Sequence, residues 1–269
     1  MRSVMLTLVG RSWARMAAVF AAVGGVLVGF QFVLIAVASS LSASKGFEQL
    51  GRIPLPRFIL HNFGMGEISF AGATTLGYYD PLVIMLLVQF AVYAGSEPAG
   101  DVELGLVDLV MARPIPREWL VTRSIVLVTA VTVALTLSMG AGTWAGLAWL
   151  APANERWPQA RLVGLLMAHL GALAWAFGCV TIAVAAWVRR RGAAQASVAV
   201  AAIALYFVEM VGQSWDRAAP LARLVPFHYY HGASLVNGRA NAAFDLSIFA
   251  ALGAVGVAAA YWQFGRRDL

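Results

Sequence analysis

The chain has 269 residues, of which 61% are apolar and only 12% are charged, and its mean hydropathy is +0.76. Because soluble domains are about 45–50% apolar and about 25% charged, these values exclude a soluble enzyme, a secreted disulfide scaffold and a disordered chain, and predict a polytopic membrane protein. The net charge of +6 and the pI of about 10.0 then indicate basic loops beside anionic lipid rather than binding to nucleic acid.

The segment at about residues 3–16 has the periodicity of an amphipathic helix. Apolar side chains, among them Trp13 and Met16, recur on one side, and Arg11 and Arg15 fall on the other. We expect an interfacial helix with its tryptophan at the depth of the lipid head groups and its arginines facing phosphate. A basic flank without that orientation is the alternative.

Six apolar runs follow, and a membrane-spanning helix needs about 20 such residues. The second run is clearest from Pro81 to Ala94, and we expect it to begin near Thr75. The six predicted spans cover approximately residues 17–41, 75–94, 120–150, 162–188, 193–211 and 244–264. The expected fold is therefore an all-α polytopic membrane protein with one transmembrane domain over residues 1–269.

Six spans place both termini on the same side of the membrane. Tight clusters of basic residues beside the spans, such as Arg189 to Arg191, fall on that side, and we therefore expect both termini in the cytoplasm. The opposite side then holds a loop at about residues 42–74 and another at about 213–243, whose apolar residues are expected to touch the outer leaflet. The composition, rich in arginine and alanine, points to a bacterial inner membrane.

The loop between the second and third spans, at about residues 97–117, carries acidic residues first and basic residues last, as a helix dipole favours. Its apolar residues share one face, and Pro114 and Pro116 end the predicted helix. This arrangement predicts a short amphipathic helix that docks into a soluble partner, or a connector that lies on the inner leaflet. The charged residues of the loop are Glu97, Asp101, Glu103, Asp108, Arg113 and Arg117.

This loop resembles the first cytoplasmic loop of ABC type-2 export permeases, the membrane subunits of ATP-binding-cassette transporters. The leucine at position 106 and the proline at position 116 depart from the threonine and serine that are usual in the family. A looser similarity covers residues 226–230, before the last span. The family's two acids, glycine, proline and arginine fall on Glu103, Asp108, Gly105, Pro114 and Arg117.

The resemblance implies that two permease chains, as a homodimer, sit on two copies of a separate ABC ATPase subunit. A coupling helix at about residues 103–111 would transmit closure of the ATPase dimer to the spans and shift them between inward-open and outward-open states. ATP and Mg²⁺ would bind to the partner, with no cofactor in this chain. The residues that the resemblance assigns to ATPase coupling are Glu103, Gly105, Asp108, Arg113, Pro114 and Arg117.

Several kinds of catalytic motif are missing from the sequence. A phosphate loop needs a lysine, and the only lysine, Lys45, falls on the predicted outer side outside any such motif. There is no HExxH zinc motif, the single Cys179 cannot form an internal disulfide, and only His228 and His231 lie close to each other in sequence. We therefore expect a membrane subunit that is not itself an enzyme and that holds no metal.

Polar residues inside the predicted spans or at their ends are costly in lipid and are candidates for a substrate path. Hydrogen bonding between helices explains each of them singly, and we favour that explanation. The glycines at positions 140, 142 and 146 indicate close helix packing. The candidates for the substrate path are Gln31, Asp80, Gln89 and Glu209, and Gln195 is a further polar residue in the fifth span.

Three other functions stay open at this point. A secondary transporter predicts spans broken at the midplane and inverted repeats, and the sequence indicates neither. An integral membrane enzyme needs a polar cluster at one interface, and the best available cluster, at residues 228–231, has no nucleophile or metal motif. A mechanotransmitting subunit that moves no substrate would share every sequence feature of a permease.

Overall fold

A computed structural model describes residues 2–44, 46–47, 69–105, 118–188, 190–230, 232–238 and 240–266, except for the side chains of residues 2–9, 11 and 233. These residues are almost all helical, and six helices are long and apolar enough to cross a membrane. The prediction of an all-α chain with six helices long and apolar enough to cross a membrane is thereby confirmed for the described residues. The candidate spans are Ser12–Ala43, Phe70–Gly95, Glu118–Leu150, Ala160–Trp187, Arg191–Ser214 and Ala242–Arg266.

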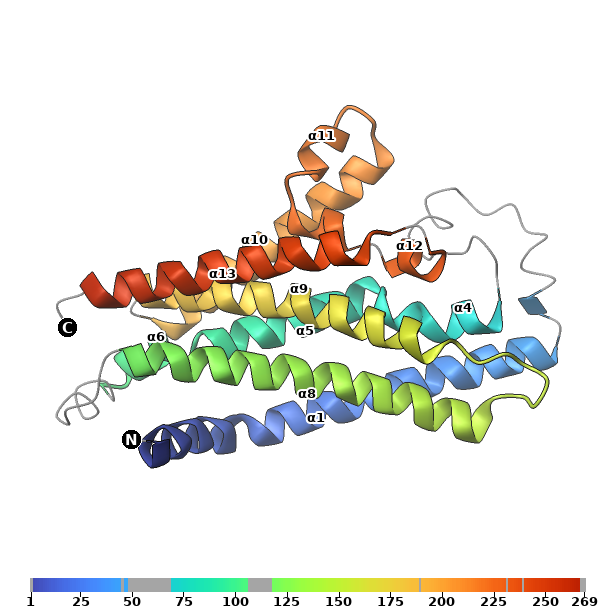
Figure 1. Cartoon of the computed structure of the whole chain (residues 1–269), viewed down its shortest axis with the longest axis horizontal. Coiled ribbons are helices and arrows are strands. Elements are labelled where there is room, and N and C mark those ends of the chain that lie inside the picture. The colour runs from blue at the N-terminus through green and yellow to red at the C-terminus, as the bar shows by residue number, and fades with distance from the viewer. Residues whose placement is uncertain are drawn as a thin grey trace.

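The first helix, α1 (Arg2–Ala43), runs without a break from the predicted interfacial segment through the first span (Figure 1). The sequence across this junction contains no proline, so nothing there ends a helix. Met16, on the predicted apolar side, packs in the core, and Arg15 approaches the carboxylate of Glu97, while the interfacial orientation of the segment stays a prediction. Residues 3–16 are thus part of the first long helix rather than a separate element.

The second span begins earlier than expected and is interrupted. It consists of α4 (Phe70–Thr75), the 3₁₀ turn η1 (Leu76–Tyr78) and α5 (Pro81–Gly95). Asp80 ends the interruption: its Oδ1 accepts hydrogen bonds from the backbone N–H groups of Leu82 at 2.9 Å and Val83 at 3.2 Å. An aspartate cap followed by proline is a strong start signal for a helix. The interruption lies nearer the start of the span at Phe70 than its end at Gly95, so the expectation that no span is broken at the midplane stays a prediction.

Small residues bring the central helices close together. The third span, α8 (Glu118–Leu150), lies along α1, and a Cβ atom added at Gly142 would come within 2.8 Å of the carbonyl oxygen of Val28. The fourth span, α9 (Ala160–Trp187), packs against the sixth, α13 (Ala242–Arg266), where Gly256 meets the backbone of Cys179 in the same way. The glycines thus permit helix packing at close backbone distance, as predicted.

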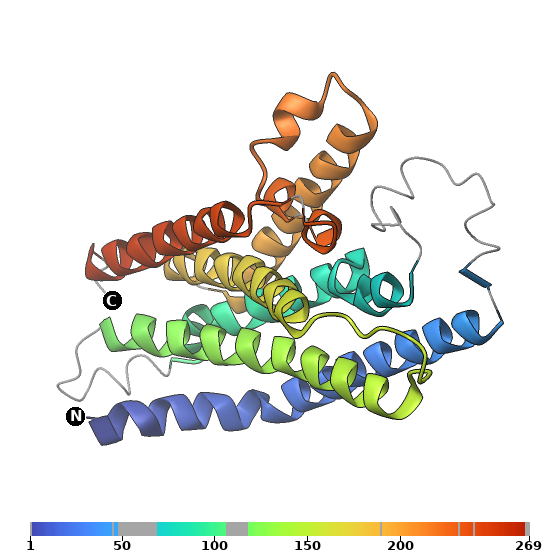
Figure 2. The same cartoon turned by 45° about the vertical axis from the view of Figure 1, so that its right-hand side comes forward.

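The fifth span, α10 (Arg191–Ser214), diverges from the other long helices in both views (Figures 1 and 2). It continues into the short elements α11 (Ala219–Ala222), η2 (Pro226–Tyr229) and α12 (Gly232–Val236). Large apolar side chains along α10, such as Ile203 and Phe207, are exposed in the single chain. Its buried residues are Ala194, Val198, Ala202 and Glu209.

Both termini lie at one end of the bundle, as an even number of spans requires (Figure 1). The short helix α6 (Glu97–Glu103) follows α5 at that same end. We call it the terminal end; its assignment to the cytoplasm remains a prediction from the loop charges.

Candidate functional site: a charged cluster at the terminal end

Helix α6 is the part of the predicted coupling loop that the structure describes. It comes directly after Ser96, ends at Glu103, and is followed by a turn in which Gly105 has φ 64°, a conformation that glycine adopts without strain. Of the expected coupling helix at about residues 103–111, the structure describes only residues 103–105, and the remainder lies outside the described residues. Asp108, Arg113, Pro114 and Arg117 lie outside the described residues.

Two of the three acidic side chains of α6, Glu97 and Asp101, are buried between the spans, whereas Glu103 is exposed. Glu97 is only 2% exposed and Asp101 only 5%. A buried carboxylate is unstable unless it is paired or hydrogen-bonded, so these two residues require partners within the protein. The structure supplies arginines from three different spans.

Arg15 of α1 and Arg123 of α8 hold the two carboxylates from one side. Arg15 Nη2 lies 3.1 Å from Glu97 Oε2 and 3.7 Å from Asp101 Oδ1. Arg123 Nη2 donates a short hydrogen bond to Asp101 Oδ2 and lies 3.9 Å from Glu97 Oε2. Helix α6 is thereby fixed to the first and third spans at the same point.

Arg191, the first residue of α10, closes the cluster from the other side. Its Nη1 lies 3.4 Å from Glu97 Oε1, and its Nε donates to Ser96 Oγ at 3.2 Å. The guanidinium also lies over the ring of Tyr93, 4.5 Å from the centroid, which is a cation–π distance. One side chain thus joins α10 to the end of α5 and the start of α6.

Glu103 makes a separate contact with α10. Its Oε2 accepts a hydrogen bond of 2.8 Å from the backbone N–H of Arg191. The first N–H groups of a helix lack partners within the helix, and its dipole favours a negative charge there. Gln195, one turn further along α10, donates from Nε2 to Ser96 Oγ at 2.8 Å. The last residue of α6 therefore caps the fifth span.

The cluster balances its formal charges. We define it as Arg15, Glu97, Asp101, Glu103, Arg123 and Arg191, which combine three arginines with three carboxylates from α1, α6, α8 and α10. The buried centre of the cluster is Glu97, Asp101 and Arg123, where the loss of one member leaves an opposite charge unpaired in a desolvated place, while Arg15 and Glu103 lie at its exposed edge.

Sequence reasoning found part of this cluster. It singled out Glu103 and Gly105 from the loop motif and noted Glu97 and Asp101 as acidic. It missed the arginine partners, since Arg15 and Glu97 are 82 positions apart and Glu103 and Arg191 are 88 apart. The only available signal was the position of each arginine at the terminal end of a predicted span.

The four candidates for a substrate path have separate surroundings. Gln31 is fully buried on α1, where its amide lies against Gly77, and Asp80 caps α5. Glu209 lies on α10 towards the far end, with its Oε2 3.2 Å from His228 Nδ1. Gln89 lines a cavity between α5 and α10. Within the described ranges, no hydrogen bond or ion pair joins any two of the four, so they do not form one continuous site.

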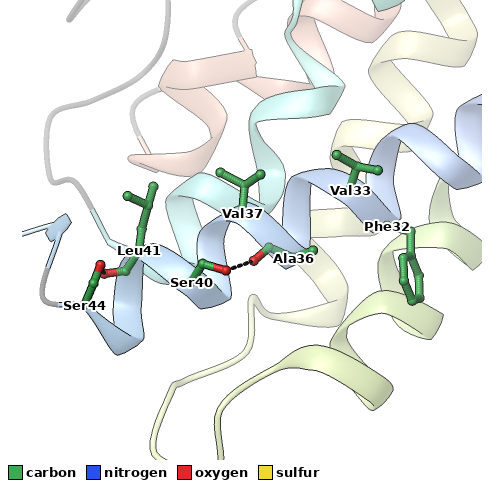
Figure 3. A pocket seen from close by; sticks show the side chains of 7 residues that line it. All are labelled: Phe32, Val33, Ala36, Val37, Ser40, Leu41 and Ser44. Atoms are coloured by element: carbon green, nitrogen blue, oxygen red, sulfur yellow. Dashed lines mark hydrogen bonds between the residues drawn. The ribbon is translucent and has the colours of Figure 1, made fainter.

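A second hollow lies on the surface of α1 towards the end opposite the termini, with a volume of about 540 Å³ (Figure 3). Its polar lining groups are already engaged, because Ser40 Oγ donates to Ala36 O at 3.0 Å and Ser44 Oγ donates to Leu41 O at 3.2 Å. The remaining lining residues, Phe32, Val33, Ala36, Val37 and Leu41, offer apolar side chains. This hollow has no anchoring group for a polar ligand.

Among the residues described, no three histidine, cysteine, aspartate or glutamate side chains are grouped so that they could hold a metal ion. His169 is fully buried on α9, and its Nδ1 lies 2.9 Å from the carbonyl oxygen of Leu165. Tyr230, outside the spans, donates its hydroxyl to the carbonyl oxygen of Tyr78, and burial raises the pKa of that hydroxyl. These groups serve packing and hydrogen bonding within the bundle.

No protein-family model, curated protein or solved structure matches the chain. Arguments about its function therefore depend on the loop motif and on the geometry of the terminal end.

Proposed function

We propose that the chain is the membrane subunit of an ABC transporter, an export permease of the type-2 family that is driven by a separate ATPase. The observation that carries the proposal is the attachment of α6 to three spans. The loop motif that resembles a coupling segment begins at Glu103, which contacts α10, and Glu97 and Asp101 of the same short helix contact α1 and α8.

This attachment gives a route for mechanical work. Packed helices and ion-paired networks move as units between discrete arrangements rather than deforming continuously. A displacement of α6 by a partner would therefore be passed to the three helices whose arginines hold it. The chain has no phosphate loop, so ATP and Mg²⁺ would bind to the ATPase, and this chain would turn closure of that partner into movement of its spans.

Helix α10 is the span best suited to move. It buries few residues against the rest of the chain, and its first turn is held by Glu103 and by the hydrogen bond from Gln195 to Ser96. We propose that α10 moves furthest when α6 is displaced, because α1 and α8, which α6 also contacts, are packed against each other through the close approach at Gly142.

One observation favours a second candidate, a secondary transporter. The interruption between η1 and α5 resembles the broken helices at which such proteins bind ions. At this break, however, Asp80 Oδ1 is occupied by two backbone N–H groups of α5, which makes the carboxylate a cap. The interruption therefore gives less support than the cluster does.

The test is co-expression of the tagged full-length chain with the ABC ATPase encoded beside its gene, followed by purification in mild detergent. We expect the ATPase to co-elute in equal amount with the permease. The variant Glu103→Arg would place a cation beside the N-terminus of α10 and should lose the ATPase or its stimulation. The matched control is Glu155→Arg, which changes a carboxylate on the loop at the opposite end of α8, where Glu155 bonds Ser42. A folded wild-type chain from which no ATPase co-elutes would contradict the proposal.

A further inference from the structure

A cavity of about 240 Å³ lies between α5 and α10, next to the charged cluster. Gln89, Phe90, Val92 and Tyr93 of α5 line it from one side, and Gln195 of α10 lines it from the other. Tyr93 carries the guanidinium of Arg191 over its ring, so the terminal end of the cavity borders the cluster. The cavity thus has the amide of Gln195 at the end near the cluster and the amide of Gln89 further from the cluster, with the rings of Phe90 and Tyr93 between them along α5.

The amide of Gln89 is the group that points to a ligand. Its Nε2 atom is buried and has no hydrogen-bond partner among the described residues. A donor in a hydrocarbon environment is costly unless it meets an acceptor, because no water is available there. Gln195 differs, since its Nε2 already donates to Ser96. The unmet requirement is therefore an acceptor oxygen near Gln89.

The depth of the cavity limits what can supply this oxygen. Gln89 precedes Ser96 by seven residues, which is about 10 Å along a helix that rises 1.5 Å per residue. Gln195 is at the level of Ser96, beside the ion pairs. The cavity therefore extends from the polar boundary of the membrane into its hydrocarbon region. Diacyl lipids carry their ester carbonyl oxygens in this interval, between the head group and the acyl chains.

We propose that this cavity binds a glycerolipid from the leaflet on the side of the termini, through an ester carbonyl that accepts a hydrogen bond from Gln89 Nε2. Phe90 and Val92 contact the start of an acyl chain, and the head group lies towards Arg191. The site needs no ATPase and goes beyond the proposed transport function, so either can fail without the other.

The probes are dioleoylphosphatidylglycerol and its dialkyl ether analogue, which differs only in lacking the two carbonyl oxygens. Native mass spectrometry of the purified full-length chain measures how tightly each lipid is retained. We expect the wild type to retain the diester about 3- to 10-fold more tightly, the effect of one neutral hydrogen bond. Equal retention of the two lipids by the wild type would overturn the proposal, and this comparison depends on no variant.

Two variants then assign the preference to the cavity. Gln89→Leu removes the donor and should abolish the preference for the diester. Gln263→Leu removes a second glutamine with a buried, unpartnered amide atom, on α13 and away from the cavity, and should keep the preference. A preference that survives Gln89→Leu in a folded protein would also overturn the assignment.

Discussion

Replacement of Arg123 by methionine tests whether the charged cluster is held away from water. The side chain of Arg123 is 4% exposed, and those of its partners Asp101 and Glu97 are 7% and 3% exposed. Breaking a buried ion pair costs about 3–5 kcal/mol because a charge is left unpaired, whereas an exposed pair contributes about 0–1 kcal/mol. Since Arg15 still reaches both carboxylates, we expect a loss near the lower limit, about 3 kcal/mol.

The free energy of unfolding can be measured by titrating the protein from mild detergent into dodecyl sulfate micelles and following the fluorescence of its nine tryptophans. Arg190→Met, at an exposed arginine beside the cluster, is the matched control and should change stability by about 0.5 kcal/mol or less. Adding Asp101→Asn to Arg123→Met should recover part of the loss, because the unpaired carboxylate is removed. A change below about 1 kcal/mol for Arg123→Met would refute the view that the cluster is desolvated.

Three further predictions concern other contacts. Glu103→Gln should cost about 0.3–1 kcal/mol and speed hydrogen exchange in the first turn of α10, because the cap loses its charge; unchanged exchange would contradict the capping role. Gly142→Ala should destabilise the protein by about 1–3 kcal/mol in thermal unfolding, since its new methyl group meets the α1 backbone. The control Gly164→Ala has open space around it and should not destabilise the protein; equal effects of the two variants would argue against close packing of α1 and α8. His228→Ala should cost about 1 kcal/mol, because the buried carboxylate of Glu209 loses a partner, and no loss of thermal stability would show that the pair is not formed.

The spans could be predicted from the sequence because apolar length is a local property. The third predicted span, residues 120–150, differs from α8 (Glu118–Leu150) by two residues at one end only. The interruption of the second span was partly visible, because the apolar run is clearest from Pro81 and the charged Asp80 stands directly before it. The pair Asp80–Pro81 marks the start of α5, since aspartate at the cap and proline in the first turn commonly begin a helix.

The charged cluster was less accessible to sequence reasoning. The acidic residues of α6 were visible, but they were interpreted as favourable to the helix dipole of a docking or surface helix, because periodicity alone does not show which face is buried. Burial of Glu97 and Asp101 follows from the way α6 folds back between spans that are distant in the chain. The residues that pair with them, Arg15 and Arg191, are far away in the sequence, so no rule based on residue spacing predicts these ion pairs.

The arginines of the cluster can serve two purposes in succession. During insertion, basic residues beside a span hold that side in the cytoplasm, and acidic residues contribute little to this effect. After folding, Arg15, Arg123 and Arg191 neutralise the carboxylates of α6. The two purposes can be separated experimentally, because Asp101→Asn weakens the cluster without changing any basic residue. That variant should therefore lower stability while leaving the orientation of the termini, measured by protease protection of terminal tags, as it is in the wild type.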